Sequence, residues 1–418
     1  MSALEAVAGV TVVAPGAGDT HMLRGLGFRP RAVVAWWTCQ SGHGVAAGNR
    51  GGLGFWTSRG AVAVGWSSED GAPEVRASQV TADSALVGFS ADGTTLGLTG
   101  NLASLDADGL TIAWTIAPTE TWIVHFLALG GEGLTDARAG WSAVDGAATE
   151  SFVDSLETDA SLVLVAPARG GSVAVSRDGA VVGLGAQSEG QQVASAYSVK
   201  SGAMPGEVAG SQRHGASIIL PEMDGGTRSG VLGRRSGAPA TIHWSAPPGQ
   251  AHRVCYLTLQ GIRAHVGVAL SPTEPGKRRT RVGFRPNAIL FFSWGLGAAP
   301  ETKRIGRLCV GAASARDVMV CGGWDDRNTE ESRTGTHVVS STAEVVVVTD
   351  TRNGGVHAAA SVCEIGRRGF RLAWATSDGK MREVPFVALG AHAAPSSSAL
   401  RLLVTRLVAV AGSRKRSA

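Results

Sequence analysis

The sequence predicts an all-β protein of three tandem antiparallel β-sandwich (jelly-roll-like) domains, each about 130 residues long. A tryptophan-containing segment at residues 106–131 recurs twice, and its copies place Trp114, Trp244 and Trp374 at intervals of 130 residues. The apolar segments are short, rich in Val, Ile, Leu and Trp, and separated by Gly, Asp-Gly or Pro. Gly accounts for 58 of 418 residues and charged residues for only 17%, which favours strands and turns over long surface helices.

The repeat divides the chain into residues 1–135, 136–262 and 263–418, and the third repeat ends in a basic C-terminal tail. The first and third repeats open alike, because the GFRP motif at residues 27–30 recurs at residues 283–286. The second repeat lacks this motif and is therefore the divergent one. A length of about 130 residues is an ordinary domain size, sufficient for each repeat to bury a core of its own.

Eight short apolar segments predict the strands of the first repeat. The turn signals between them have the spacing of a sandwich, and none of the segments has the 3.6-residue period of a long helix. The predicted strands cover residues 10–13, 32–38, 54–57, 61–66, 85–90, 102–105, 110–115 and 122–129.

Comparison of the three copies of the last strand assigns its two faces. One face is apolar in every copy and is predicted to point into the sandwich, because side chains alternate across a strand. Its residues are Val124, Val254, Val384, Phe126, Tyr256 and Phe386. The other face holds His125, Cys255 and Pro385, which differ freely. The three repeat tryptophans share a face with Ile112, Ile242 and Leu372, so we expect them in the core as well.

The net charge of +4 is a weak signal for a chain of this length. The basic residues gather in short runs, Arg234-Arg235, Lys277-Arg278-Arg279, Arg367-Arg368 and Arg414-Lys415-Arg416. These runs are interpreted as solvated loops and a charged terminus. The alternative, a nucleic-acid or other anionic surface, is not favoured, since no aromatic residues are interleaved for stacking.

Five cysteines, an odd number without a CxxC pair, indicate free thiols in a reducing cytosol rather than a disulfide framework or a zinc site. The N-terminus shows no secretion signal, and no apolar run approaches the roughly 18 residues of a membrane span. We therefore expect synthesis in a reducing cytosol and no membrane partner.

No spacing typical of catalysis is present: the sequence lacks GxSxG, GxxxxGK[ST] and HExxH motifs. His125 and His243 occupy positions that differ between the repeats, which does not favour a ligand role. Residues 106–109 (DADG) resemble the start of a calcium loop but lack its other ligands, and are interpreted as a turn. The acidic pairs Glu69-Asp70 and Asp325-Asp326 follow strand-end tryptophans and are predicted to cap solvated loops. We predict a non-enzyme without catalytic, cofactor-binding or metal-binding residues.

Eleven tryptophans against two tyrosines leave a surface role open. Trp36 and Trp37 are adjacent, so in a strand one of them points away from the core. Burial against a neighbouring subunit explains this as well as a sugar-stacking platform does. Trp36 and Trp56 are the candidate surface or ligand contacts. Residues 39–52 and 186–214 differ most from their counterparts and are predicted to carry differences in binding.

The sequence also resembles a repeat found in structural proteins of tailed bacteriophages and prophages, often encoded among tail genes. The first repeat carries the likeness at residues 25–28, 69–70, 104–115, 123–131 and 134–140. The third repeat keeps residues 283–286, Trp374 and residues 386–390, and the second keeps little beyond Trp244 and residues 256–261. The resemblance implies a β-sandwich building block of the virion and supplies no active site.

We therefore expect a non-catalytic virion structural protein, either tail-associated, as a minor tail protein, or decorating the capsid head. Its expected partners are other virion proteins and further copies of itself. The alternative is a carbohydrate-binding module for host recognition, with host-surface glycans as partners. Neither a cofactor nor nucleic acid is expected.

Overall fold

The computed structural model describes residues 3–16, 18–69, 76–153, 159–170, 175–202, 207–222, 226–233, 240–295, 305–316, 318–327 and 335–392. Within these residues the chain forms 31 β-strands, all paired antiparallel, and no helix. The predicted all-β, antiparallel sandwich class is thereby confirmed. The basic tail at residues 414–416 and the pair Arg234-Arg235 lie outside the described residues.

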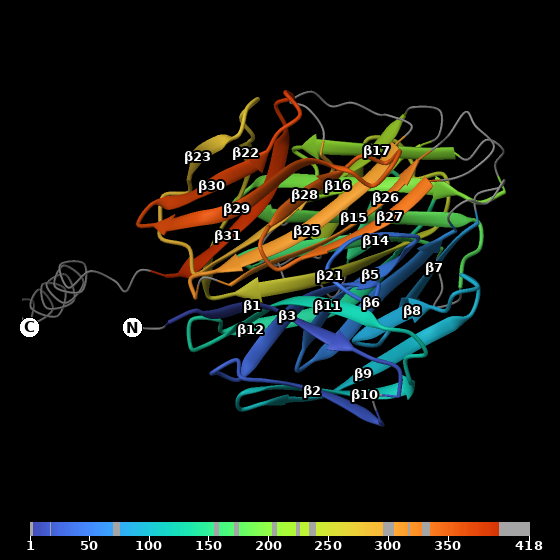
Figure 1. Ribbon diagram of the computed structural model, residues 1–418, viewed down its shortest axis with the longest axis horizontal. Helices are drawn as coiled ribbons and strands as arrows, with labels where there is room; N and C mark the ends of the chain where they lie inside the picture. The colour runs from blue at the N-terminus through green and yellow to red at the C-terminus, as the bar shows by residue number, and fades with distance from the viewer. Residues whose placement is uncertain are drawn as a thin grey trace, which may run out of the picture.

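The strands form six sheets in three pairs, and each pair follows one of the sequence repeats (Figure 1). We call the pairs units 1, 2 and 3. Each unit consists of a large sheet and a four-stranded outer sheet.

The strands of unit 1 are β1 (Glu5–Val13), β2 (Thr20–Arg24), β3 (Pro30–Cys39), β4 (Gly44–Ala47), β5 (Asn49–Thr57), β6 (Gly60–Ser68), β7 (Ala77–Ala82), β8 (Leu86–Phe89), β9 (Leu96–Asp106), β10 (Gly109–Ile116) and β11 (Trp122–Gly130). The large sheet has the order β1-β11-β3-β5-β6-β7 and the outer sheet the order β2-β10-β9-β8. Strands β3, β5, β6 and β7 follow one another within the large sheet. In a jelly roll of two Greek keys, by contrast, the chain passes from one sheet to the other.

The strands of unit 2 are β12 (Asp136–Val144), β13 (Glu150–Val153), β14 (Leu162–Arg169), β15 (Gly179–Ser188), β16 (Gln191–Lys200), β17 (Glu207–His214), β18 (Ile218–Pro221), β19 (Thr227–Gly233), β20 (Ala240–Trp244) and β21 (His252–Gln260). The large sheet has the order β12-β21-β14-β15-β16-β17 and the outer sheet the order β13-β20-β19-β18, so unit 2 repeats the connectivity of unit 1.

The strands of unit 3 are β22 (Ile262–Leu270), β23 (Gly276–Arg281), β24 (Ala288–Ser293), β25 (Ile305–Ser314), β26 (Met319–Arg327), β27 (Gly335–Ser341), β28 (Val346–Thr349), β29 (Val356–Gly366), β30 (Gly369–Thr376) and β31 (Glu383–Ala391). The outer sheet has the order β23-β30-β29-β28. The large sheet, β22-β31-β24-β25-β26-β27-β4, has a seventh strand because β4 of unit 1 joins its edge.

All eight strands predicted for the first repeat are present, and sequence reasoning missed β2, β4 and β7. The described residues of the variable segment 186–214 form mainly β16, β17 and the end of β15, and most of them are buried. Its polar composition is compatible with a strand because serine and glutamine side chains bond across the sheet, as Ser195 does with Gln212.

Each unit encloses a core between its two sheets, and the predicted face assignment is correct there. Val124 and Phe126 pack in the core of unit 1, with Trp37, Ile112 and the half-buried Trp114. The equivalent residues of the other units are Val254, Tyr256, Ile242 and Trp244 in unit 2, and Val384, Phe386, Leu372 and Trp374 in unit 3.

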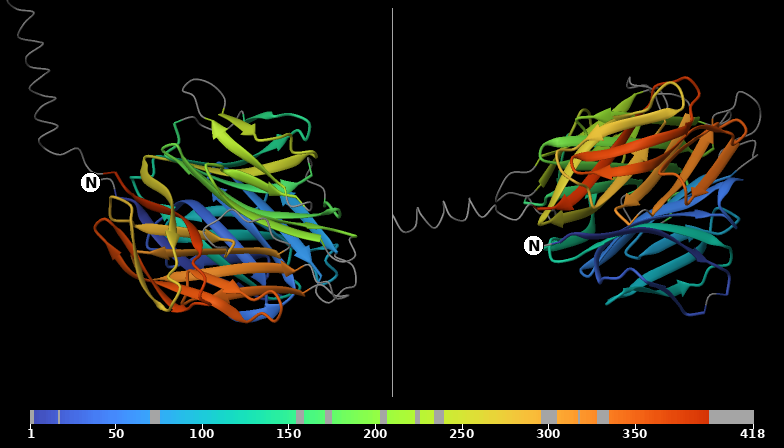
Figure 2. Two further views of the ribbon diagram at one scale, coloured as in Figure 1. Left: turned by 90° about the horizontal axis from the view of Figure 1, so that it is seen from above. Right: turned by 60° about the vertical axis from the view of Figure 1, so that its left-hand side comes forward.

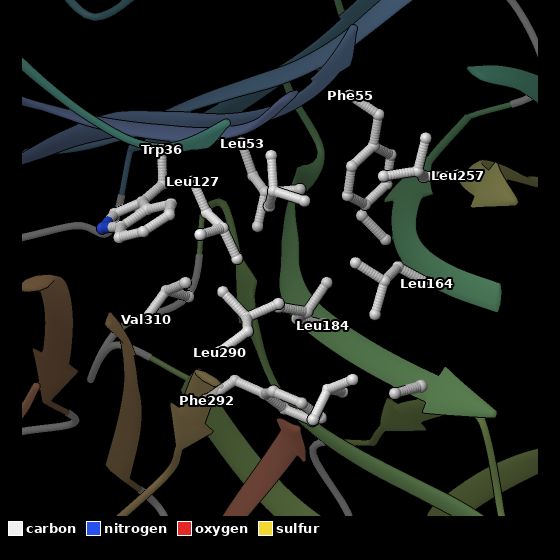
Figure 3. Close-up of a cluster of buried hydrophobic side chains, with 14 of the residues drawn as sticks. Trp36, Leu53, Phe55, Leu127, Leu164, Leu184, Leu257, Leu290, Phe292 and Val310 are labelled. Carbon is white, nitrogen blue, oxygen red and sulfur yellow. The ribbon is translucent and has the colours of Figure 1, made fainter. Parts of the chain in front are cut away.

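The second face of the large sheets is buried as well, in a core that all three units share. We call this the central core. Figure 3 shows Leu127 of unit 1, Leu184 and Leu257 of unit 2, and Leu290 of unit 3 pointing toward one another. Because a fully buried leucine stabilises a fold by about 2 kcal/mol, this core is a large contribution to stability that depends on all three units together.

The three groups of strands lie against one another, and the outer sheets are on the outside (Figures 1 and 2). Edges of large sheets are covered by a neighbouring unit. Strand β4 pairs with β27 from Ala47 opposite His337 to Gly44 opposite Ser340. Gln79 of β7 exchanges two main-chain hydrogen bonds with Ser176 of unit 2. Covering these edges removes sites at which another chain could add a strand.

Candidate functional site

Three large aromatic side chains meet where the large sheets of the three units converge. Trp66 on β6, Tyr197 on β16 and Trp324 on β26 occupy equivalent register positions, opposite Gly51, Val182 and Leu308. All three are buried, and the rings of Trp66 and Trp324 meet edge to face with their centres 4.8 Å apart. Equivalent strands of the three units therefore each place one aromatic ring where the large sheets converge.

Asn49, at the start of β5, connects these rings by hydrogen bonds. Its Nδ2 donates to the Tyr197 hydroxyl at 2.9 Å and to Asp326 Oδ2 at 2.5 Å, and its Oδ1 accepts from Trp66 Nε1 at 3.2 Å. We call Asn49, Trp66, Tyr197 and Asp326 the junction cluster. Since its members come from units 1, 2 and 3, the cluster fixes their relative register by directional bonds as well as by apolar packing.

Asp326 is a buried acid within this cluster. Burial raises the pKa of its carboxyl to about 8, and the negative charge of Asp325 adds to the rise. Burial and the charge of Asp326 in turn raise the pKa of Tyr197 well above its ordinary value. Asp325 accepts from Thr349 and lies 2.9 Å from His337 Nδ1. The prediction that Asp325-Asp326 caps a solvated loop is wrong, because strand β26 continues through both residues and neighbouring strands cover them.

A cavity of about 250 Å³ lies beside the junction cluster, between strands β4 to β7 and the turn that joins β8 to β9 of unit 1. Its lining includes Asn49 and Ser68, together with two arginines that already have acidic partners. Arg50 Nη2 lies 2.8 Å from Glu120, and Arg76 lies 3.6 Å from Glu69. None of the described residues that line it is aromatic, so the cavity does not offer a ring on which a sugar could stack.

The two candidate ligand tryptophans are both buried, and the prediction that they contact a ligand at the surface is wrong. Trp36 is 0% exposed and packs in the central core, stacked on His125 with ring centres 5.9 Å apart. Trp56 is 1% exposed in the core of unit 1, where its Nε1 donates to the Ala85 carbonyl at 2.6 Å. Trp36 does point away from its own sandwich, but the surface that covers it belongs to the same chain.

His125, predicted to be on a freely varying face, is also buried between units. Its Nε2 lies 2.8 Å from Ser340 Oγ of β27, and His43 Nδ1 lies 2.8 Å from the same oxygen. Burial lowers the pKa of His125 to about 3, and the charge of His43 adds to the decrease, so the imidazole is neutral at pH 7. The face varies between repeats because each copy meets a different neighbour. Cys255, at the equivalent position, is buried too.

The outward faces of the three outer sheets differ in chemistry although their strands correspond. The exposed row of unit 1 includes Met22 and Thr111, which lie opposite one another. The corresponding row of unit 2 holds Phe152 opposite Thr241, and that of unit 3 holds Arg279 opposite Arg371. The turn at residues 106–109, predicted as a turn rather than a calcium site, joins β9 to β10. Within the described residues, no group of three or more His, Cys, Asp or Glu side chains is placed to hold a metal ion.

No family model, curated protein or solved structure matches this chain. Over the described ranges, no helix is long and apolar enough to cross a membrane.

Proposed function

We propose that this chain is a non-catalytic structural protein of a bacteriophage virion, tail-associated or decorating the head, which assembles through protein–protein contacts. The observation that carries the proposal is the use of the large sheets. One face of each large sheet packs in the core of its own unit and the other face packs in the central core, so the outer sheets remain as contact surfaces. This arrangement suits a rigid block that presents several surfaces to different neighbours.

Fusion of the repeats supports the same proposal. Three linked units fold beside one another at high effective concentration, and each is free to diverge for its own neighbour. The outer faces have diverged in this way, with Met22, Phe152 and Arg279 at equivalent places. The resemblance to virion repeats in residues 104–115 and 123–131 points in the same direction.

The second candidate function, recognition of host-surface glycans, lacks a specific observation in its favour. Trp36 and Trp56, on which it rested, are 0% and 1% exposed. We therefore do not propose it.

The test is to purify particles from a lysate of a host that carries the gene and to quantify the chain by mass spectrometry. Under the proposal, it sediments with intact particles in a constant ratio to the major capsid protein. A free cytosolic protein in the same lysate serves as the control for adhering material. Loss of the chain at the same wash as this control would overturn the proposal.

A further inference from the structure

The outward face of the unit 3 outer sheet carries a dense group of basic side chains. On β23, Lys277, Arg279 and Arg281 alternate with residues of the other face, and all three are exposed. The register of β23 on β30 places Arg281 opposite Gly369, directly beside the turn that contains Arg367 and Arg368. Two basic runs that are remote in sequence therefore form one surface. We call Lys277, Arg279, Arg281, Arg367, Arg368 and Arg371 the basic face.

The charge of the basic face is largely uncompensated. Among the described residues, the ion pair recorded on this face joins Arg371 Nη1 to Glu364 at 3.3 Å. The whole chain has a formal net charge of only +4, so positive charge is concentrated here and offset elsewhere. Like charges this close repel one another. Without an anionic partner, this repulsion destabilises the folded state.

The guanidinium groups of the turn arginines form no hydrogen bond or ion pair among the described residues, unlike the side chain at the same turn in unit 1. There Asp108 stands in place of Arg368, and its carboxylate accepts from the main-chain nitrogens of Gly25 and Gly27. In unit 3 the main-chain carbonyl of Arg368 accepts from Val282 at 2.9 Å, and the guanidinium takes no part in this bond. The two side chains are therefore available to a partner.

We propose that the basic face binds the phosphate backbone of duplex DNA without reading its sequence. A partner for six cations spread over a sheet must present closely repeated negative charge, and duplex DNA carries one charge per roughly 1.7 Å of its axis. Among the described residues of this sheet, the Phe and Trp side chains, Phe370 and Trp374, are buried, so bases of a single strand have no exposed Phe or Trp ring on which to stack. This inference does not rest on the proposed virion role.

The proposal departs from the sequence-based expectation that nucleic acid is not a partner. That expectation treated each basic run as a separate solvated loop. The β23–β30 register joins the runs at residues 277–279 and 367–368 into one surface, which no spacing along the chain reveals.

The test measures binding of the full chain to a fluorescent duplex of about 30 base pairs by anisotropy, between about 50 and 200 mM salt. With about four phosphate contacts, the logarithm of the affinity is expected to fall with the logarithm of salt concentration with a slope of about −3.6. The variant Lys277→Gln/Arg279→Gln/Arg281→Gln is expected to bind at least about tenfold more weakly and to have a slope shallower by about 2.7.

The matched control removes three exposed positive charges outside the basic face, one from each unit: Arg24→Gln/Arg177→Gln/Arg352→Gln. Its affinity is expected to stay within about twofold of the wild type. An equal loss in both variants would show that net charge alone attracts DNA, and overturns the proposal. Unchanged binding by the basic-face variant, which keeps the basic tail at residues 414–416, overturns it too. So does tighter binding of heparin or polyglutamate than of the duplex at the same salt concentration.

Discussion

The large sheets and the outer sheets have the same antiparallel chemistry but opposite relations to solvent. In β11 of a large sheet every residue from Trp122 to Gly130 is buried, because one face packs in its own unit and the other in the central core. In β13 of an outer sheet buried and exposed residues alternate strictly. The first pattern is typical of a sheet enclosed on both sides, and the second of a sheet with one solvated face.

The comparison shows that sequence differences between repeats have two distinct causes. In the large sheets, differences such as His125 against Cys255 arise because each copy packs against a different region of the same chain. In the outer sheets, differences such as Phe152 against Arg279 have no partner among the described residues to explain them, and they are where specialisation for outside partners is expected.

The strongest test of the shared core is to produce one unit alone. Residues 1–135 would expose the face of the large sheet that holds Trp36, Leu53, Phe55 and Leu127, all of which are buried in the full chain. An apolar face of this extent is an association site, so we expect the fragment to aggregate or to remain incompletely folded. Sedimentation and near-ultraviolet circular dichroism, with the full chain as the control, check this. A soluble, folded monomer would show that the units are independent domains.

A single charge in the central core is a second large perturbation. Leu184→Asp places a carboxylate where leucine is 1% exposed, among side chains of all three units (Figure 3). Because the charge has no partner there, we expect the free energy of unfolding to fall by about 4 kcal/mol or more. Thr241→Asp, on the outward face of the same unit, is the control and should change it by about 0.5 kcal/mol or less. Denaturant titration of both variants checks the difference.

The sequence was informative wherever the repeats agree. Val124 and Phe126 could be assigned to a core because their copies are apolar in every unit, and a sandwich face demands that alternation. The eight predicted strands of unit 1 could be found because each is a short apolar segment bounded by turn residues. Strands β2, β4 and β7 were missed because they are edge strands, and β4 joins the sheet of another unit, so their pairing is set by distant segments.

The site could not be predicted, because its residues lie on elements that only the packing of the units brings together. Trp66, Tyr197 and Trp324 do not follow the constant 130-residue spacing, and Asp326 looks like a solvated acid when β26 is considered alone. One signal was present. Aspartates are almost never fully buried unless they are paired, so a strand that continues through an acidic pair indicates buried acids with partners elsewhere.

Asp326 makes stability depend on pH in a direction that can be measured. Its carboxyl keeps its proton up to about pH 8 in the folded chain, whereas its ordinary pKa is 3.8. The folded state therefore binds more protons in this window, and the free energy of unfolding falls as pH rises from about 4 to 8, by about 1.4 kcal/mol per pH unit. Asp326→Asn mimics the protonated acid, because the amide has an oxygen that accepts from Asn49 and N–H hydrogens in place of the O–H of the acid. It should lose this dependence.

The measurement is the difference in unfolding free energy between Asp326→Asn and the wild type at several pH values. Taking the difference cancels the contribution of His125, whose lowered pKa of about 3 acts in the opposite direction by making the folded state less stable below about pH 6.5. We expect the variant to gain stability relative to the wild type as pH rises. A difference that stays constant from pH 5 to 8 contradicts a buried, protonated Asp326.

The smallest effect is expected on an outward face, and two adjacent residues of β13 give the sharpest form of the comparison. Phe152 is 59% exposed, and its neighbour Val153 is 1% exposed in the core of unit 2. Phe152→Ser should change the free energy of unfolding by about 0.5 kcal/mol or less, since little apolar area leaves water at that position. Val153→Ser should cost about 2 to 3 kcal/mol, because it removes apolar burial and buries a hydroxyl. Denaturant titration of the pair decides: if Phe152→Ser costs as much as Val153→Ser, the outward face of the outer sheet contributes to the fold itself. If only Val153→Ser is costly, the large exposed ring of Phe152 is a feature of the surface and not of the core.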